Sequence, residues 1–409
     1  MNREPTISPV ARRGRFAGLP RTVWALGLVS LLMDTSSELV HSLLPVFMTA
    51  TLGASMVTVG LVEGLAEATA AVLKVFSGVI SDRFRRRKLL ILLGYGLAAA
   101  TKPMFPLARS VAWVLAARLL DRVGKGVRGA PRDALVADLV PAARRGAAYG
   151  LRQALDSIGA VLGPVLAIVA VAALSLDTRT ALWIGALPAA LAVVVILVAV
   201  HEPAHAGQAS SSSPLRLAAA RRLGGRYWMV IALAAVLMLA RFSEAFLVLR
   251  AADLGLTVAW VPAVMVVMNL VYSGVSYPAG IAFDGGHRRA LLGWGMAALI
   301  ASDVMLAAAS GMPLLFAGVA LWGLHMGLTQ GLLSSLVGTT APAELRGTAF
   351  GIFHLVSAGA QLAASVIAGG LWEGVGPRAT FGAGAAFATV ALLGLWSARF
   401  TVPPARPRG

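Results

Sequence analysis

The sequence is dominated by a succession of apolar segments, each close to the length needed to cross a lipid bilayer. A spanning α-helix requires about 20 predominantly apolar residues. Twelve such segments lie at residues 22–45, 56–80, 89–108, 111–131, 147–172, 181–200, 228–249, 258–282, 290–309, 313–337, 348–371 and 379–399. Charged residues make up only 13% of the chain, whereas soluble domains carry about 25%. We therefore predict an all-α membrane protein with twelve transmembrane helices.

The basic residues indicate how these helices are oriented. Twelve spans place both termini on one side, where the loops hold 23 Lys and Arg residues, against 4 in the loops of the other side. The positive-inside rule therefore predicts that both termini are cytoplasmic. This asymmetry accounts for much of the net charge of +17, so we expect contact with anionic lipid and no nucleic-acid partner. We expect a multi-pass, monomeric protein of the bacterial inner membrane.

A polar stretch near the middle divides the chain into six plus six spans. It contains the sequence HEPAHAGQASSSSPLR, whose Ser, Gly and Pro content is typical of a flexible linker. We predict an N-terminal six-helix bundle at 1–205, a cytoplasmic linker at 206–226 and a C-terminal six-helix bundle at 227–409.

The two halves resemble each other in sequence. The segment SGVISDRFRRRKLL at 77–90 aligns with AGIAFDGGHRRALL at 279–292, and 144–160 aligns with 345–361 at nearly the same offset. A duplicated six-span unit is typical of secondary transporters, in which the binding site lies between the repeats near the bilayer midplane. We therefore expect two six-helix repeats around a central cavity.

Three motifs resemble those of the major facilitator superfamily. They are Gly78-x-x-x-Asp82-Arg83 followed by Arg86, Arg87 and Lys88; Arg122-x-x-Lys125-Gly126; and Gly159-x-x-x-Gly163-Pro164. The resemblance covers nearly the whole chain and implies a transporter with the 6+6 fold. It also implies that Arg122 takes part in proton coupling. The motif in span 5 is associated with antiporters, which usually export their cargo. Lys125 stands where the family more often has glutamine.

The first of these motifs predicts a conformational latch. Asp82 lies near the end of span 2 and basic residues follow it, so the cluster can pair across helices in one state and separate in the other. With the matching positions of the second half, the predicted latch comprises Gly78, Asp82, Arg83, Arg86, Gly280 and Asp284. The alternative is that the basic run only sets the topology.

Eight acidic and eight basic residues lie inside the spans, six of the acids and seven of the bases in the first half. A charge at the centre of a span costs at least about 2.5–3.5 kcal/mol, so these groups should face water or each other. A carboxylate that moves between a buried environment and a nearby cation can take up and release a proton. The candidates for proton coupling are Asp34, Glu38, Asp121, Arg122, Glu63 and Glu67. The alternative is that they form static ion pairs between helices.

A second set of residues is expected to line the cavity and contact the cargo. The basic span 4 favours an anionic or zwitterionic cargo, because the planar guanidinium group suits carboxylate or phosphate. The candidates are Arg118, Lys102, Arg152, Asn269, His325, His354 and Gln361. The histidines could equally form interhelical hydrogen bonds. Arg241 and Glu244, three residues apart, are expected to pair.

We therefore predict a proton-coupled secondary transporter that exports a small organic anion, zwitterion or drug by antiport. Proton symport that imports a metal chelate, siderophore or organic anion is the alternative, and a non-transporting membrane sensor is a weaker one. The sequence contains no HExxH, G-x-S-x-G or Walker motif, so we predict neither an enzyme nor an ATP-driven pump. It contains no cysteine, and we predict no cofactor and no metal site.

Overall fold

The computed structural model describes residues 18–84, 86–141, 144–202, 217–284, 286–329, 332–342 and 345–397. The regular structure in these ranges is entirely helical. The first half contains α1 (Arg21–Val46), η2 (Phe47–Thr51), α2 (Met56–Phe84), α3 (Arg87–Thr101), η3 (Lys102–Met104), α4 (Val111–Leu139), α5 (Arg145–Ile168), η5 (Val169–Ala173), α6 (Thr178–Ile184) and α7 (Ala186–Ala199).

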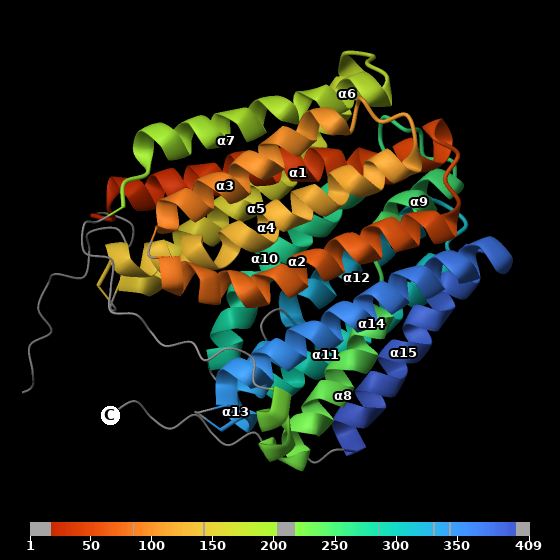
Figure 1. Cartoon of the computed structure of the whole chain (residues 1–409). Helices are drawn as coiled ribbons and strands as arrows, with labels where there is room; N and C mark the ends of the chain where they lie inside the picture. Colours follow the sequence, from red (N-terminus) through yellow and green to blue (C-terminus); the bar gives the residue numbers. More distant parts are fainter. Residues whose placement is uncertain are drawn as a thin grey trace, which may run out of the picture.

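The second half begins with a short 3₁₀ helix inside the predicted linker. Its elements are η6 (Leu217–Arg222), α8 (Gly225–Ala240), α9 (Ala245–Asp253), α10 (Ala263–Asp284), α11 (Arg288–Ala308), α12 (Met312–Thr329), α13 (Leu332–Thr340), α14 (Arg346–Gly374) and α15 (Pro377–Ser397). Figure 1 shows α1, α3, α6 and α7 on one side of the molecule and α8, α11, α13 and α15 on the other, with α2 and α10 drawn between them.

Ten helical segments of the described chain are long and apolar enough to cross a membrane. Two further helices of the first half, α3 and α4, do not meet this criterion of length and apolarity. Helix α3 has only 15 residues, and α4 carries many charges. Both pack within the bundle, α3 against α4 and α7. The all-helical membrane fold is thus confirmed, and the twelve crossing segments are consistent with the predicted count.

Helix α4 is longer than the sequence pattern indicated. The apolar pattern predicts a span that ends at residue 131, whereas α4 continues through Pro131 to Leu139. Hydropathy falls at the last turns because Arg128, Arg132 and Asp133 lie there. A helix satisfies its own backbone hydrogen bonds, so it can continue wherever its polar side chains face water or partners.

Span 7 is broken, although the sequence pattern predicts one continuous segment at 228–249. Helix α8 ends at Ala240, α9 starts at Ala245, and residues 241–244 are not helical. The N–H of Ser243 donates to Oγ of Ser365 on α14 at 3.2 Å, so the neighbouring helix satisfies part of the freed backbone.

The break also changes the expected pairing of Arg241 with Glu244. The two residues lie in the non-helical segment, so their side chains do not have helical spacing. Among the described residues, no hydrogen bond and no ion pair within 4 Å joins them. The expected close ion pair is therefore not formed, although the two charges still interact electrostatically.

Close helix contacts hold the first half together through the glycines of the span-5 motif. A Cβ atom at Gly159 would lie 2.5 Å from the Leu31 carbonyl oxygen, and one at Gly163 would lie 2.5 Å from the Thr35 carbonyl oxygen. Both glycines therefore face α1, and Pro164 follows within the same helix. In this conformation the two glycines allow close packing of α5 on α1.

The two halves meet closely at the outer ends of the helices. A Cβ at Gly64 of α2 would lie 2.8 Å from a Leu362 methyl group, and Gly60 and Gly369 make similarly close contacts between α2 and α14. Helix α1 also contacts α9 at this end. These contacts close the outer side of the molecule.

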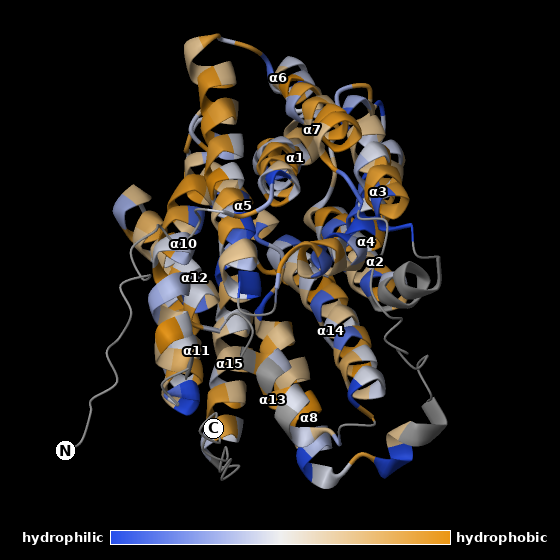
Figure 2. Ribbon diagram, turned by 90° about the vertical axis from the view of Figure 1, so that its left-hand side faces the viewer, coloured by the Kyte–Doolittle hydropathy of each residue, from blue (hydrophilic) through white to orange (hydrophobic). Residues whose placement is uncertain are grey.

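Figure 2 shows hydrophobic positions along most helices, with hydrophilic positions gathered in the interior around α2, α4 and α5.

Candidate functional site

A cavity of about 520 Å³ lies between the two halves. Much of its lining comes from the cytoplasmic portions of α2, α4 and α5, whereas the outer portions of α2 and α14 are in contact. The structure is therefore inward-facing. The carboxylates of the lining are Asp34, Glu38, Glu67, Asp133, Asp156 and Glu244, and the cations are Lys74, Arg122, Lys125, Arg128, Arg132 and Arg152. The six acids balance the six bases, so the lining lacks the excess of basic over acidic residues counted in the spans of the first half.

The two walls of the cavity differ in chemistry. All the charged residues of the lining except Glu244 come from the first half. The second half contributes mainly thioethers, amides and a phenol, namely Met265, Met268, Met326, Asn269, Gln361 and Tyr272. Such a cavity suits a molecule that has a charged group on one side and an apolar or neutral polar body on the other.

One buried ion pair joins α2 to α4 away from the cavity. Nε of Arg118 donates to Oε1 of Glu63 at 3.1 Å, and a second guanidinium nitrogen donates to the other carboxylate oxygen. The side chains are only 2% and 1% exposed. His41 extends the cluster toward the cavity, with Nε2 3.6 Å from Oε2 of Glu63 and Nδ1 3.7 Å from Oε2 of Glu38.

A second buried pair joins η3 to α4. Nζ of Lys102 donates to Oδ1 of Asp121 at 2.9 Å and to Oγ of Ser37 at 3.0 Å. Asp121 also lies 3.7 Å from Nε of Arg122. Lys102 and Asp121 are almost entirely buried. The pair therefore connects helices in the interior of the bundle.

Several predicted cavity residues lie elsewhere. Arg118 and Lys102 are outside the lining because each meets a carboxylate from a neighbouring helix. His325 is fully buried, and its Nδ1 lies 2.8 Å from the Gly295 carbonyl oxygen, between α12 and α11. His354 packs beside Phe353 on α14 and is also outside the lining. In this conformation none of these four residues lines the cavity, and their contact with a cargo stays a prediction.

Three predicted cavity residues do line the cavity. Asn269 donates from Nδ2 to the Ala160 carbonyl oxygen at 3.0 Å, which links α10 to α5 across the two halves. Arg152 lies in the lining and pairs with Asp156 one turn along α5. Gln361 lies in the lining on α14. Their contact with a cargo stays a prediction.

The carboxylates named for proton coupling fall into two groups. Glu63 and Asp121 are held in the buried pairs, whereas Asp34, Glu38 and Glu67 line the cavity. Oε1 of Glu67 lies 3.3 Å from Nη1 of Arg122. Asp34 has no hydrogen bond and no ion pair within 4 Å in the part of the chain that the structure describes. It interacts electrostatically with Asp156, Lys125 and Arg128.

The cations of the cavity are also unequal. Three of them, Lys74, Lys125 and Arg128, form no ion pair within 4 Å with any described residue. The guanidinium carbon of Arg128 lies 4.3 Å from the centre of the Tyr95 ring, and its buried Nη1 has no hydrogen-bond partner among the described residues. These groups are available to an anionic part of a ligand.

Sequence reasoning missed part of this lining. Arg132 and Asp133 fell in a predicted loop, although they lie on α4 and face the cavity. A signal was present: Asp121, Lys125, Arg128 and Arg132 recur every three or four residues, which is the spacing of one helix face. Treating this stripe as helical would have extended span 4.

The predicted latch lies mostly beyond what the structure describes. The positions Gly78, Asp82 and Arg83 belong to the last turns of α2, and Gly280 and Asp284 to those of α10. The side chains of residues 78–85 and 284 are outside the described part. Arg86 is exposed just before α3. The latch therefore stays a prediction.

The adjacent Arg87 makes contacts within the first half. Its side chain pairs with Asp138 and donates to the Ala134 carbonyl oxygen at 3.0 Å. Its backbone N–H donates to Oε1 of Glu202 at 2.8 Å. These contacts join α3 to the end of α4 and to the segment after α7.

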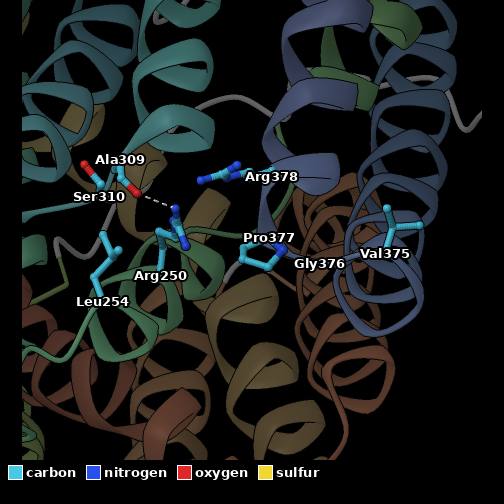
Figure 3. Close-up of a pocket in the computed structure, with 8 residues that line it drawn as sticks. All are labelled: Arg250, Leu254, Ala309, Ser310, Val375, Gly376, Pro377 and Arg378. Carbon is cyan, nitrogen blue, oxygen red and sulfur yellow. Dashed lines mark hydrogen bonds between the residues drawn. The ribbon is translucent and has the colours of Figure 1, made fainter.

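A second, smaller cavity of about 320 Å³ lies at the outer end of the second half (Figure 3). Figure 3 shows the side chains of Arg250 and Arg378 extending between Ala309 and Pro377. Nε of Arg250 donates to the Leu306 carbonyl oxygen at 3.1 Å, and Nη2 donates to that of Ala309 at 2.7 Å. Arg250 therefore caps the carboxyl end of α11, where a cation is favourable.

Comparison with known proteins agrees with this architecture. The family model of the Major Facilitator Superfamily matches residues 26–353. An uncharacterized MFS-type transporter of Methanocaldococcus jannaschii is 30% identical over 383 residues, which cover 91% of this chain and 93% of the relative. A probable 4-methylmuconolactone transporter of Cupriavidus pinatubonensis is 29% identical over 233 residues, covering 54% of this chain and 53% of the relative.

Solved structures show the same fold. A mutant of the nucleoside transporter NupG has a TM-score of 0.79 at 16% identity, covering 92% of this chain and 99% of that one. The matched residues extend through both halves that enclose the central cavity. The chain belongs to the major facilitator superfamily of transporters.

Proposed function

We propose that this transporter exchanges protons for a small zwitterionic organic solute and exports that solute from the cytoplasm. The observation that carries the proposal is the neighbourhood of Asp34. This cavity carboxylate has no ion pair with any described residue, and it interacts electrostatically with Lys125 and Arg128, which also lack ion pairs within 4 Å. One cavity therefore offers a carboxylate for a cation and two cations for an anion.

The charge arrangement connects the type of cargo to the direction of coupling. A cationic group of the cargo that binds beside Asp34 favours its ionised form, so cargo binding displaces a proton and produces antiport. A purely anionic cargo at Lys125 and Arg128 would favour protonation of Asp34, and proton and cargo would then move together. A zwitterion presents both charges, and the cationic one competes directly with the proton.

The neutral wall of the second half supports a cargo with an apolar body. Met265, Met268 and Met326 provide adaptable apolar surface, and Asn269 and Gln361 provide hydrogen-bonding groups. One chain contributes both walls, so a monomer suffices for alternating access. The positive-inside pattern is consistent with a prokaryotic cytoplasmic membrane, which we propose as the location.

Everted membrane vesicles with an imposed pH gradient test the proposal. The probes are an aromatic zwitterion, its cationic methyl ester and its anionic N-acetyl derivative, and a pH-sensitive dye in the lumen reports proton movement. We expect the zwitterion to enter the vesicle lumen in exchange for protons. Uptake of the anion together with protons would favour symport instead. Transport driven equally by sodium, without any proton flux, would refute proton coupling.

The Asp34→Asn variant localises the coupling. We expect it to insert normally and to lose proton exchange, because the amide cannot carry the proton. Asp133→Asn is the matched control, since Asp133 is another cavity carboxylate but lies 3.3 Å from Nε of Arg132. Equal loss of exchange in both variants would contradict a specific role for Asp34.

A further inference from the structure

Helix α11 carries a carboxyl group that is enclosed by protein and outside the transport cavity. Asp303 is 0% exposed, and neither of its side-chain oxygens has a hydrogen-bond partner among the described residues. An ionised carboxylate in such surroundings is strongly disfavoured, because it loses its hydration and gains no donor or counterion. A neutral carboxylic acid does not bear this penalty.

The surroundings of Asp303 form a niche shaped to the carboxyl group. A Cβ atom at Gly384 on α15 would lie 2.5 Å from Oδ2 of Asp303 and 3.0 Å from Cε1 of Phe242. Glycine at 384 thus leaves room for the carboxyl group. The Phe242 ring also contacts Trp322 and Phe381, with ring centres 5.4 and 5.5 Å apart. Aromatic side chains therefore adjoin the niche.

The charged and titratable groups on the elements around Asp303 do not provide it with a counterion. None of them forms an ion pair with Asp303 in the part of the chain that the structure describes. Arg250 on α9 caps the Leu306 and Ala309 carbonyls and pairs with Asp253. The remaining groups are His325 on α12, Arg378 on α15, Arg241 and Glu244 in the break of span 7, and Tyr272 and Tyr277 on α10.

We propose that Asp303 is a proton-binding site of the second half, loaded in this inward-facing state and sealed by Phe242. Phe242 lies in the break of span 7, where the backbone does not continue as a helix, so its ring can change position while the bodies of α8 and α9 stay intact. Such a movement would admit water, and the carboxylic acid would release its single proton to leave a carboxylate. The site extends the proposed proton coupling, but its protonation can be measured without any transport.

Two carbodiimides of different polarity test this site in the purified full-length protein. Dicyclohexylcarbodiimide enters apolar regions and modifies protonated carboxyl groups, whereas a water-soluble carbodiimide modifies carboxyl groups that water reaches. We expect the lipophilic reagent to modify Asp303 between pH 6 and pH 8, as detected by peptide mass spectrometry. The water-soluble reagent should modify Glu244, which lines the cavity, at least tenfold more than Asp303. No lipophilic labelling, or equal aqueous labelling of both residues, would overturn the proposal.

Three variants separate the proposed site from a structural role. Asp303→Asn should abolish the label and leave the melting temperature unchanged or raised, because a neutral isostere replaces a neutral acid. A marked fall in melting temperature would instead indicate an ionised, paired carboxylate. Phe242→Ala should raise aqueous labelling of Asp303 at least fivefold, and unchanged labelling would contradict the seal.

The third variant tests the niche itself. Gly384→Ala should lower lipophilic labelling of Asp303 severalfold, since the added methyl group occupies the carboxyl position. Gly382→Ala on the same helix is the control, because a Cβ there meets no other atom within 4 Å. Equal labelling of the two variants would contradict the niche. These results do not depend on the exchange assay, so failure of the proposed function and failure of this site can be distinguished.

Discussion

Replacing Glu63 by glutamine should destabilise the protein far more than the same change at Glu38. Glu63→Gln leaves the Arg118 guanidinium, which is 2% exposed, without its counterion. Removing one partner of a buried ion pair costs about 3–5 kcal/mol, because the remaining charge stays desolvated. An entropy of unfolding of about 2.1 cal/mol/K per residue over the 409 residues converts this loss to roughly 3–6 °C in melting temperature.

The matched control uses the second glutamate beside the same histidine. Glu38 is 27% exposed to the cavity and lies 3.7 Å from Nδ1 of His41. Exposed ion pairs contribute at most about 1 kcal/mol, so Glu38→Gln should lower the melting temperature by about 1 °C. Both variants would be heated in detergent and assayed by fluorescence-detected size-exclusion chromatography.

A double variant identifies the cause. Glu63→Gln combined with Arg118→Gln should recover most of the lost stability, because replacing both partners of a buried pair leaves no uncompensated charge. The reasoning fails if Glu63→Gln melts within 1 °C of Glu38→Gln. It also fails if the double variant melts lower than Glu63→Gln, since Arg118 would then stabilise the bundle by another contact.

Two further predictions concern helix contacts. Gly163→Ala places a methyl group 2.5 Å from the Thr35 carbonyl oxygen and should lower the stability of the fold by about 1–3 kcal/mol. The control is Gly150→Ala on the same helix, where the added methyl group meets nothing within 4 Å and should be neutral or stabilising. Equal melting temperatures of the two variants would contradict the packing role of Gly163. Asn269→Ala removes the 3.0 Å hydrogen bond to the Ala160 carbonyl oxygen and should destabilise the inward-facing state by about 1 kcal/mol. Spin-label distances between the cytoplasmic ends of α5 and α10 should then shift toward the outward-facing state, and an unchanged distribution would show that this bond does not favour the inward-facing state.

The fold was accessible from sequence because its signals are local or repeat along the chain. Segment length and apolarity predict spanning helices, basic loops predict orientation, and the offset repeat predicts two halves. The exceptions occur where protein contacts or the cavity replace lipid. Helix α4 continues to Leu139 because Arg132 and Asp133 face the cavity, and span 7 breaks at 241–244, where Ser365 accepts a hydrogen bond from the Ser243 N–H.

The sequence by itself determined that ionisable residues would gather in spans 1, 2, 4 and 5, since their number and helical spacing can be counted. Only the tertiary structure decided what each one does. Arg118 and Arg122 lie one turn apart on α4, yet Arg118 is buried against Glu63 while Arg122 reaches the cavity beside Glu67. In the sequence nothing distinguishes Asp303 from the other acidic residues of the spans, but in the structure α15 and the break of span 7 enclose its carboxyl group. The physical reason is that burial and partners come from neighbouring helices, and sequence spacing along one helix does not specify them.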